Sequence, residues 1–205
     1  MMRFGSLLAI AGLAVLAMAS EARAQVDFEI TPFGGGTLFL ADMPNQYALH
    51  GDVIRDGAFD NAWTLGLNAG FRFNEKWAIE GMFSWIPTRL TAASGLAGSE
   101  DVNGYMYGVT GLFYIPVGGL VQPFVGVGAG AETFDYRSSK YGSHTDFMGN
   151  VVGGVYFALT DMTGVRLEAR DCFARMESGV GGVDDAWEND LMLTLGVSFR
   201  TPLSR

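Results

Sequence analysis

Residues 62–74, Ala-Trp-Thr-Leu-Gly-Leu-Asn-Ala-Gly-Phe-Arg-Phe-Asn, decide the fold because their side chains alternate strictly in polarity and size. Every second residue from Trp63 to Phe73 is apolar, whereas the residues between them are small or polar. A period of two is the signature of a β-strand whose two faces meet different surroundings. The same alternation recurs in residues 77–86 and 190–200.

The chain after residue 25 repeats this pattern and predicts eight strands. We place them at residues 26–41, 62–74, 77–86, 104–116, 121–134, 146–159, 163–174 and 190–200. The connections between them are alternately long and short. The long ones are 42–61, 87–103, 135–145 and 175–189, and the short ones are 75–76, 117–120 and 160–162. Long loops alternating with short turns, and an even strand number, are typical of an antiparallel up-and-down barrel that crosses a membrane.

The residues on the two faces indicate which one points outward. In residues 165–170, Val, Leu and Ala alternate with Arg166, Glu168 and Arg170. A closed barrel of eight strands has a narrow interior, so we expect small and charged side chains inside and large apolar ones outside. An exterior of this kind is insoluble in water but suits lipid, where a closed barrel satisfies every backbone hydrogen bond.

Two sets of side chains follow from this assignment. The inward polar set, which we interpret as a paired network that fills the lumen rather than an ion path, comprises Asn68, Arg72, Glu80, Glu132, Asn150, Arg166, Glu168 and Arg170. The outward aromatic set predicts two girdles, one beside the long loops (Trp63, Trp85, Tyr105, Tyr107 and Phe147) and one at the opposite rim (Trp77, Phe113, Phe157 and Phe199).

Composition and charge exclude several classes of function. Glycine accounts for 29 of 205 residues, about twice its usual share, and only 17% of the residues are charged. The formal net charge of −9 argues against a nucleic-acid partner, which requires a basic face. The single cysteine, Cys172, excludes an intrachain disulfide and a multi-cysteine metal site, and nothing in the sequence indicates a cofactor.

The N-terminus has the features of a cleaved signal peptide. Arg3 precedes an apolar run from Leu7 to Ala19, which is short for a membrane span and is followed by Ala-Arg-Ala24. We therefore expect a signal peptide over residues 1–24, cleavage between Ala24 and Gln25, and one barrel domain over residues 25–205. The alternative is an uncleaved N-terminal anchor.

These features together resemble the small outer-membrane β-barrel family of the OmpA/OmpX type. The resemblance rests on the signal peptide, the eight amphipathic strands, the charged segment 164–171 and the closing strand 191–199. It implies a location in the outer membrane of a Gram-negative bacterium, with membrane lipid, lipopolysaccharide and the barrel-assembly machinery as partners. Members of the family often end on an aromatic residue, whereas here six residues follow Phe199. Pro32 and Gly34–Gly36 in the first strand predict a bulge or a kink there.

The function that this pattern favours is non-enzymatic: strands that anchor the protein, and four extracellular loops that serve envelope structure, surface contact or adhesion through a surface ligand. One alternative is an enzyme that modifies lipid A, with His144 or His50 as a base near Asp146 and a serine at position 138 or 143. A second is a soluble carrier of the lipocalin type. The acidic segment 177–190 could bind Ca²⁺, although we interpret it as a solvated loop.

Overall fold

The computed structural model describes residues 26–40, 46–49, 52–94, 99–138, 141–176 and 186–202. No helix in these parts of the chain is long and apolar enough to cross a membrane. The strands are β1 (Asp27–Phe39), β2 (Gln46–Leu49), β3 (Asp52–Phe59), β4 (Ala62–Arg72), β5 (Trp77–Ser94), β6 (Glu100–Tyr114), β7 (Val121–Tyr136), β8 (Ser143–Ala158), β9 (Thr163–Met176) and β10 (Ala186–Pro202).

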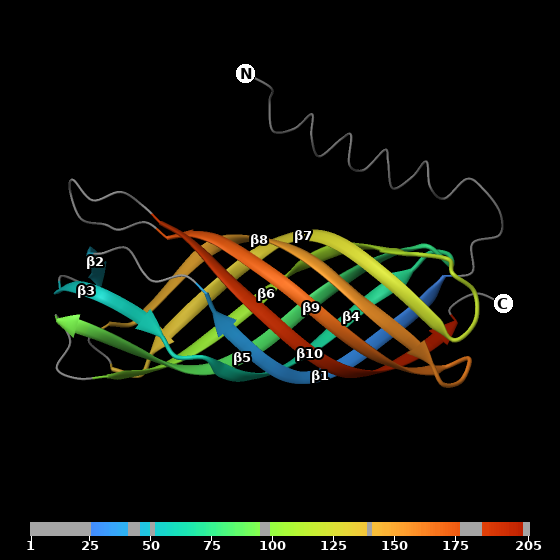
Figure 1. Ribbon diagram of the computed structural model, residues 1–205, viewed down its shortest axis with the longest axis horizontal. Coiled ribbons are helices and arrows are strands. Elements are labelled where there is room, and N and C mark those ends of the chain that lie inside the picture. Colours follow the sequence, from blue (N-terminus) through green and yellow to red (C-terminus); the bar gives the residue numbers. More distant parts are fainter. Residues whose placement is uncertain are drawn as a thin grey trace, which may run out of the picture.

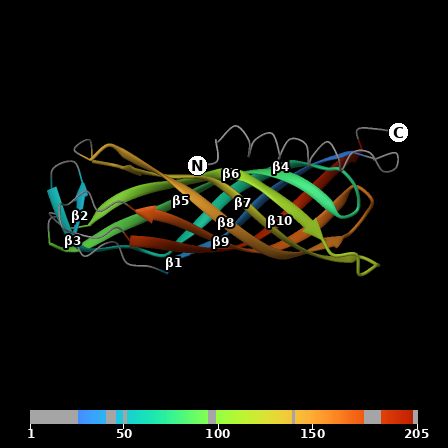
Figure 2. The same ribbon diagram turned by 90° about the horizontal axis from the view of Figure 1, so that it is seen from above.

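Eight of these strands form a closed antiparallel barrel, as the sequence predicted. The ring runs β5-β4-β1-β10-β9-β8-β7-β6, and pairing of β5 with β6 closes it. The strands wind at an angle around a long cylinder (Figures 1 and 2). We call the end that carries β2 and β3 the loop end, and the end with the short connections 73–76, 115–120 and 159–162 the turn end.

The predicted long loops were the main error of the sequence analysis. Strands β5 and β6 continue through most of residues 87–103 and remain paired as far as Leu90 and Glu100. Residues 42–61 contain the hairpin β2–β3, and β3 pairs with the last part of β5. The outward residues of these extensions are polar, as at Arg89 and Thr91, so they lack the apolar alternation that marks a strand facing lipid.

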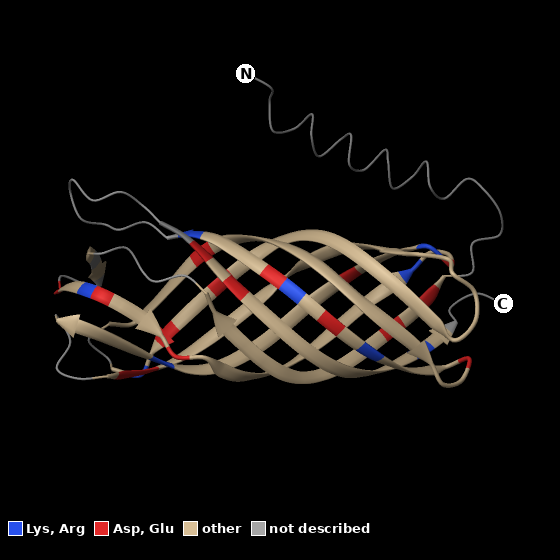
Figure 3. Ribbon diagram, in the orientation of Figure 1, with Lys and Arg blue, Asp and Glu red and all other residues tan. Residues whose placement is uncertain are grey.

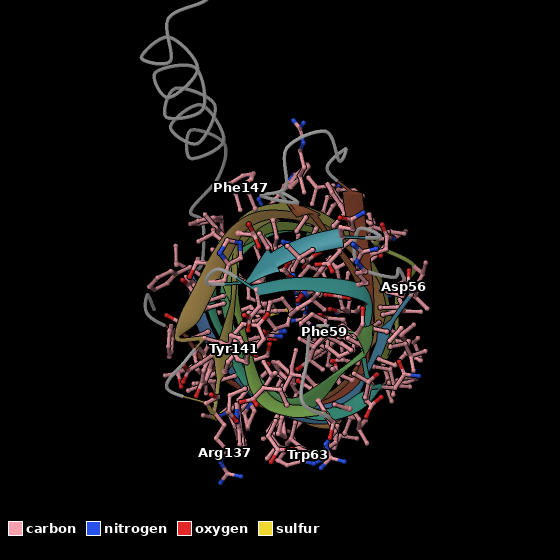
Figure 4. The ribbon with its side chains drawn as sticks, turned by 90° about the vertical axis from the view of Figure 1, so that its left-hand side faces the viewer. Asp56, Phe59, Trp63, Arg137, Tyr141 and Phe147 are labelled. Carbon is pink, nitrogen blue, oxygen red and sulfur yellow. The ribbon has the colours of Figure 1, made fainter. Side chains whose placement is uncertain are left out.

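The hairpin β2–β3 lies across the mouth of the barrel at the loop end (Figure 4). Beneath it is an apolar cluster contributed by β3, β5, β6 and β7 and by the segment that precedes β8. Its buried members are Ile54, Phe59, Leu90, Val102, Phe134, Tyr136 and Tyr141. Tyr141 also donates a hydrogen bond to Asp52 Oδ2 at 3.0 Å, which ties the hairpin to the opposite wall. We call this cluster, with β2 and β3, the lid.

The exterior of the barrel is apolar and its interior is largely polar, which confirms the predicted assignment of the two faces. Leu65, Val127, Leu195 and Phe199 are among many exposed apolar residues on the outer wall. All eight residues of the predicted inward polar set are buried. This distribution is the reverse of that in a soluble lipocalin-like carrier, whose apolar residues face inward, so that alternative is excluded.

The expectation that large aromatic rings cannot fit inside was wrong. Phe33, Phe124 and Tyr156 are buried in the lumen. Each lies against an inward glycine on a neighbouring strand: a Cβ atom added to Gly66 would overlap the ring of Phe33, and one added to Gly154 would overlap that of Phe124. The glycines therefore create the space that the rings occupy, which alternation in a single strand does not reveal.

The predicted bulge in β1 is also absent. The register of β1 against both β4 and β10 stays constant from one side of Pro32 to the other. The ladder to β10 omits Thr31 and Pro32, so the missing N–H of the proline is accommodated without an inserted residue.

Candidate functional site

The centre of the lumen holds a quartet of two arginines and two glutamates. Arg166 donates two hydrogen bonds to Glu80, one to Oε2 and one to Oε1 at 3.1 Å, and it also pairs with Glu168. Arg170 donates to Glu168 Oε1 at 2.9 Å and approaches Glu80 Oε1 at 3.5 Å. The alternating acidic and basic positions along β9 are visible in Figure 3. The formal charges of the quartet cancel, and all four side chains are buried in the lumen.

Asn150, a member of the predicted inward set, and Thr110, which was not predicted, extend the quartet through neutral side chains. Arg170 Nη1 donates to Thr110 Oγ1 and to Asn150 Oδ1, both at 2.8 Å. Asn68 is buried as well, although its Oδ1 accepts no hydrogen bond among the described residues. The quartet, Thr110 and Asn150 thus form one connected network.

A second ionic group lies in the lumen near the turn end, and sequence analysis assigned only its Arg72. Arg200 Nη2 donates to Glu29 Oε2 at 3.0 Å. Arg72 donates to Gln122 Oε1 and to the backbone carbonyl of Glu75 rather than to a carboxylate. Its guanidinium stacks on the ring of Tyr114, with Cζ 3.9 Å from the ring centroid. Charge and aromatic surface together close this end of the lumen.

Glu132 is the carboxylate of the predicted set that the structure does not bring to the arginines. It lies on β7, directly opposite Asp146 of β8 and Met106 of β6. Its side chain is 1% exposed, and Oε1 accepts no hydrogen bond from the described residues. Glu188 and Asp190, assigned by sequence to a solvated loop, lie instead on β10 and are buried. The other acidic residues of that segment lie outside the described residues.

The nine aromatic residues of the predicted girdles all lie on the outer wall, none of them buried. Trp63 and Trp85 contact each other edge to face, with their ring centroids 5.0 Å apart. Phe147 is 74% exposed, and Trp77 packs against Phe113 at the turn end. Figure 4 shows Trp63 and Phe147 on the outside of the ring and Phe59 within it.

A groove of about 510 Å³ opens on the outer wall just above the tryptophan pair. Its existence follows from an interruption in the sheet: β4 pairs with β5 only as far as Leu65 and Trp85, and β3 resumes the pairing at Phe59 and Leu90. We call it the rim groove. The residues that line it include Asp60, Trp63, Trp85, Arg89, Asp101, Asn103 and Arg137.

Asp101 connects two arginines at this groove, outside the apolar part of the wall. Arg89 Nε donates to Asp101 Oδ1 at 3.1 Å, and Arg137 Nη1 donates to Oδ2 at 3.3 Å. The hydrogen bond and charge of Arg89 lower the pKa of the Asp101 carboxyl below its ordinary value, and Arg137 lowers it further. Both arginines are more than half exposed.

Arg89→Gln is therefore expected to raise the pKa of Asp101 back toward its ordinary value, and by more than Arg137→Gln does. Because the folded-state pKa is depressed, the ionised carboxylate adds stability above the pKa of the unfolded chain and loses that contribution as the pH falls through the folded value. Carbon-detected NMR titration of the aspartate carboxyls measures both pKa values. An unchanged Asp101 pKa in the Arg89 variant would contradict the assignment.

Of the catalytic group considered for lipid A modification, the structure brings the histidine and the acid together. His144 Nε2 lies 3.1 Å from Asp146 Oδ1, and both residues are near the start of β8. Ser143 is the first residue of that strand rather than part of a loop. His50 lies outside the described residues. Among the described residues, no three His, Cys, Asp or Glu side chains are arranged to hold a metal ion.

The tryptophan pair of the rim groove was predicted as part of the girdle, but the charged residues of the groove were not. Arg89 and Asp101 are directly opposite each other in the β5–β6 ladder, so extending that hairpin by a few residues would have paired them. Arg137 lies in the connection between β7 and β8, and nothing nearby in the sequence links it to Asp101. The sequence therefore contained a signal for the pairing of Arg89 with Asp101 but none for the pairing of Arg137 with Asp101.

Comparison with known proteins agrees with the barrel. The family model described as "Outer membrane protein beta-barrel domain" matches residues 5–199. The fold is similar to OprG from Pseudomonas aeruginosa, with a TM-score of 0.56, 17% identity, and coverage of 87% of this chain and 97% of that one. Neisserial surface protein A gives a TM-score of 0.54, 15% identity, and coverage of 84% and 96%.

A third similar structure is Ail, the attachment invasion locus protein of Yersinia pestis, in complex with the heparin analogue sucrose octasulfate. Its TM-score is 0.52 at 16% identity, with coverage of 86% of this chain and 99% of that one. At such identities these likenesses concern the fold alone. No curated protein matches the chain significantly.

Proposed function

Because this chain belongs to the outer membrane protein β-barrel domain family and lies in the outer membrane of a Gram-negative bacterium, we propose that it is a non-enzymatic surface barrel whose loop end contacts other surfaces. In this arrangement the loop end and its four connections face the outside of the cell, and the turn end faces the periplasm. The observation that carries the proposal is the rigid platform that β5, β6 and the lid build beyond the apolar wall.

The side chains buried in the lumen support the proposal over the main alternative for a barrel of this size, a pore. The arginine–glutamate quartet occupies the centre, Arg72 with Tyr114 occupies the turn end, and the apolar cluster of the lid occupies the mouth. A rigid scaffold that holds irregular segments at one end is the usual setting for binding.

The rim groove is the part of the platform that we assign to contact. Tryptophan and arginine dominate the binding energy of protein interfaces because they combine a large apolar area with directional hydrogen bonds. Here Trp63, Trp85, Arg89 and Arg137 line one concave surface. The two guanidinium groups would meet a glycan-bearing surface, and the Ail structure with its sulfated sugar analogue gives a probe for that chemistry.

The test is adhesion of bacteria that display the barrel to heparin-coated beads and to an epithelial cell monolayer. Arg89→Ala with Arg137→Ala is expected to reduce adhesion several-fold. Lys76→Ala, which removes an exposed charge at the turn end, is the control and should leave adhesion unchanged. Equal adhesion by the double variant and the unaltered protein on both surfaces would overturn the assignment of the rim groove.

The second candidate function, modification of lipid A, is favoured only by the contact between His144 and Asp146. An imidazole oriented by a carboxylate is one half of a catalytic group that also needs a nucleophile within hydrogen-bond reach. Mass spectrometry of lipid A from cells that express the barrel or its His144→Ala variant separates the two proposals. A lipid A species that is lost in the variant would establish the enzyme.

We expect the barrel to remain folded in SDS unless the sample is boiled, and gel mobility tests this. The eight-stranded ring has no free edge within the apolar wall, so unboiled protein from the outer-membrane fraction should remain folded and migrate differently from boiled protein. The measurement is one gel with both samples side by side. Identical mobility, with the protein in the periplasmic fraction, would contradict the membrane-embedded barrel.

A further inference from the structure

A layer of sulfur-containing side chains crosses the lumen between the quartet and the lid. Its members come from five different strands: Met82 on β5, Met106 on β6, Met148 on β8, Cys172 on β9 and Met192 on β10. All five are buried, with at most 5% of each residue exposed. They belong to one contact cluster whose remaining buried members are Phe33, Ile86 and Ala174.

Packing of the lumen alone does not require the sulfur-containing side chains to lie together. Any aliphatic side chain can fill a barrel lumen, yet four of the seven methionines that follow residue 25 and the only cysteine meet in this one layer. Methionine also serves as a flexible filler of irregular gaps, so packing alone is the competing explanation. Thioether and thiol sulfurs are soft donors that select Cu(I) over Mg²⁺ or Ca²⁺.

A set of carboxylates borders the sulfur layer on the side of the lid. Glu132 is directly opposite Met106 in one ladder, and Asp190 is directly opposite Cys172 in another. The Cβ atoms of such directly opposed residues are about 5 Å apart. Glu132 is almost completely buried, and its Oε1 has no hydrogen-bond partner among the described residues. A buried carboxylate in this condition is costly in its ionised form unless a cation compensates it, and otherwise it is protonated.

The arginines of the lumen do not supply that compensation. Arg166 and Arg170 are engaged with Glu80 and Glu168, so the quartet has no net formal charge to offer. On the side of the lid, His144 contacts Asp146. The region that combines soft donors with carboxylates that these arginines do not pair therefore lies between the two groups.

We propose that the sulfur layer binds one soft monovalent cation, Cu(I) or its analogue Ag(I), through the methionine thioethers, with Glu132 and Asp190 balancing its charge. The carboxylates are not its ligands, in keeping with the lack of any described His, Cys, Asp and Glu group arranged to hold a metal. Binding needs no redox step, because the ion enters and remains in the +1 state.

Silver is the practical probe because Ag(I) needs no reductant to remain in that state. The folded barrel in detergent micelles is dialysed against dilute Ag(I), and the retained metal is counted by inductively coupled plasma mass spectrometry. Met106→Leu with Met148→Leu removes two thioethers while nearly conserving volume, so the barrel should still fold, as the gel shift verifies. Met162→Leu is the matched control because Met162 is exposed in the turn between β8 and β9.

The unaltered barrel and the Met162 control are expected to retain about one Ag(I) each, and the double variant to bind at least tenfold more weakly. Glu132→Gln should weaken binding several-fold if charge compensation operates as proposed. Cys172→Ser should keep most of the affinity, because the thioethers are the main ligands. The proposal fails if the unaltered barrel retains no Ag(I), if the double variant binds as well as the control, or if Cys172→Ser alone abolishes binding.

Discussion

Arg166→Met is expected to lower the free energy of unfolding of the barrel by about 3–5 kcal/mol, the range found when one partner of a buried ion pair is removed. Arg166 is 1% exposed and compensates both Glu80 and Glu168. Without it, two carboxylates in the lumen retain only Arg170 as a counter-charge. Urea titration of the barrel in detergent micelles, followed by tryptophan fluorescence, measures the change.

Two variants make this result interpretable. Lys76→Met removes a positive charge from an exposed position at the turn end and should alter stability by less than about 0.5 kcal/mol. Combining Glu80→Leu with Arg166→Met removes one charge of each sign and leaves Glu168 paired with Arg170. This combination should cost less than the sum of the two single changes. Strict additivity would show that the quartet is not an energetically coupled network.

Val127→Arg is expected to destabilise the barrel by about 2–4 kcal/mol, the cost of an arginine on the lipid-facing wall near the middle of the bilayer. Val127 is 67% exposed on β7 and lies opposite Gly111 and Val151, all within the apolar part of the wall. A charge there has no partner and no water. Unfolding in lipid vesicles, rather than in micelles, is the appropriate measurement because it preserves a bilayer.

The control lies on the same strand and has the same side chain. Val121 is the first residue of β7, next to the turn 115–120, so Val121→Arg should cost only about 0–1 kcal/mol. Comparing the two variants separates the effect of depth in the membrane from the effect of introducing an arginine. Equal costs at the two positions would mean that the outer wall does not face lipid in the proposed way.

The strands that face lipid were predicted well because a single strand carries all the information required. In β4 and β10 the surroundings change at every residue from lipid to lumen, and the side chains record that change directly. The extensions of β5 and β6 were missed because, beyond the apolar wall, the outward residues become polar while the inward Leu90 and Val102 are apolar. The pattern of the lipid-facing strands is therefore lost although the ladder continues.

In the lumen, too, the sequence predicted some features and not others. Sequence alone identified six of the charges that point inward, since the inward face follows from alternation, but it did not assign the Glu29–Arg200 pair and placed Glu188 and Asp190 in a loop. It could not say which charges meet. Glu80 and Arg166 are 86 residues apart and approach each other across the barrel, and Glu132 is separated from every arginine of the quartet although its strand also faces the lumen. Pairing across the lumen depends on strand tilt and stagger, which no single strand encodes.

By itself, the sequence determined the closed barrel, its eight strands, the apolar outer wall and the polar interior, because each of these follows from a period of two repeated along the chain. Only the tertiary structure decided what the lumen and the loop end contain: the charged quartet, the sulfur layer, the lid and the rim groove. Each of these joins residues from two or more strands that are distant in the sequence, and their meeting is set by the register with which the ring closes.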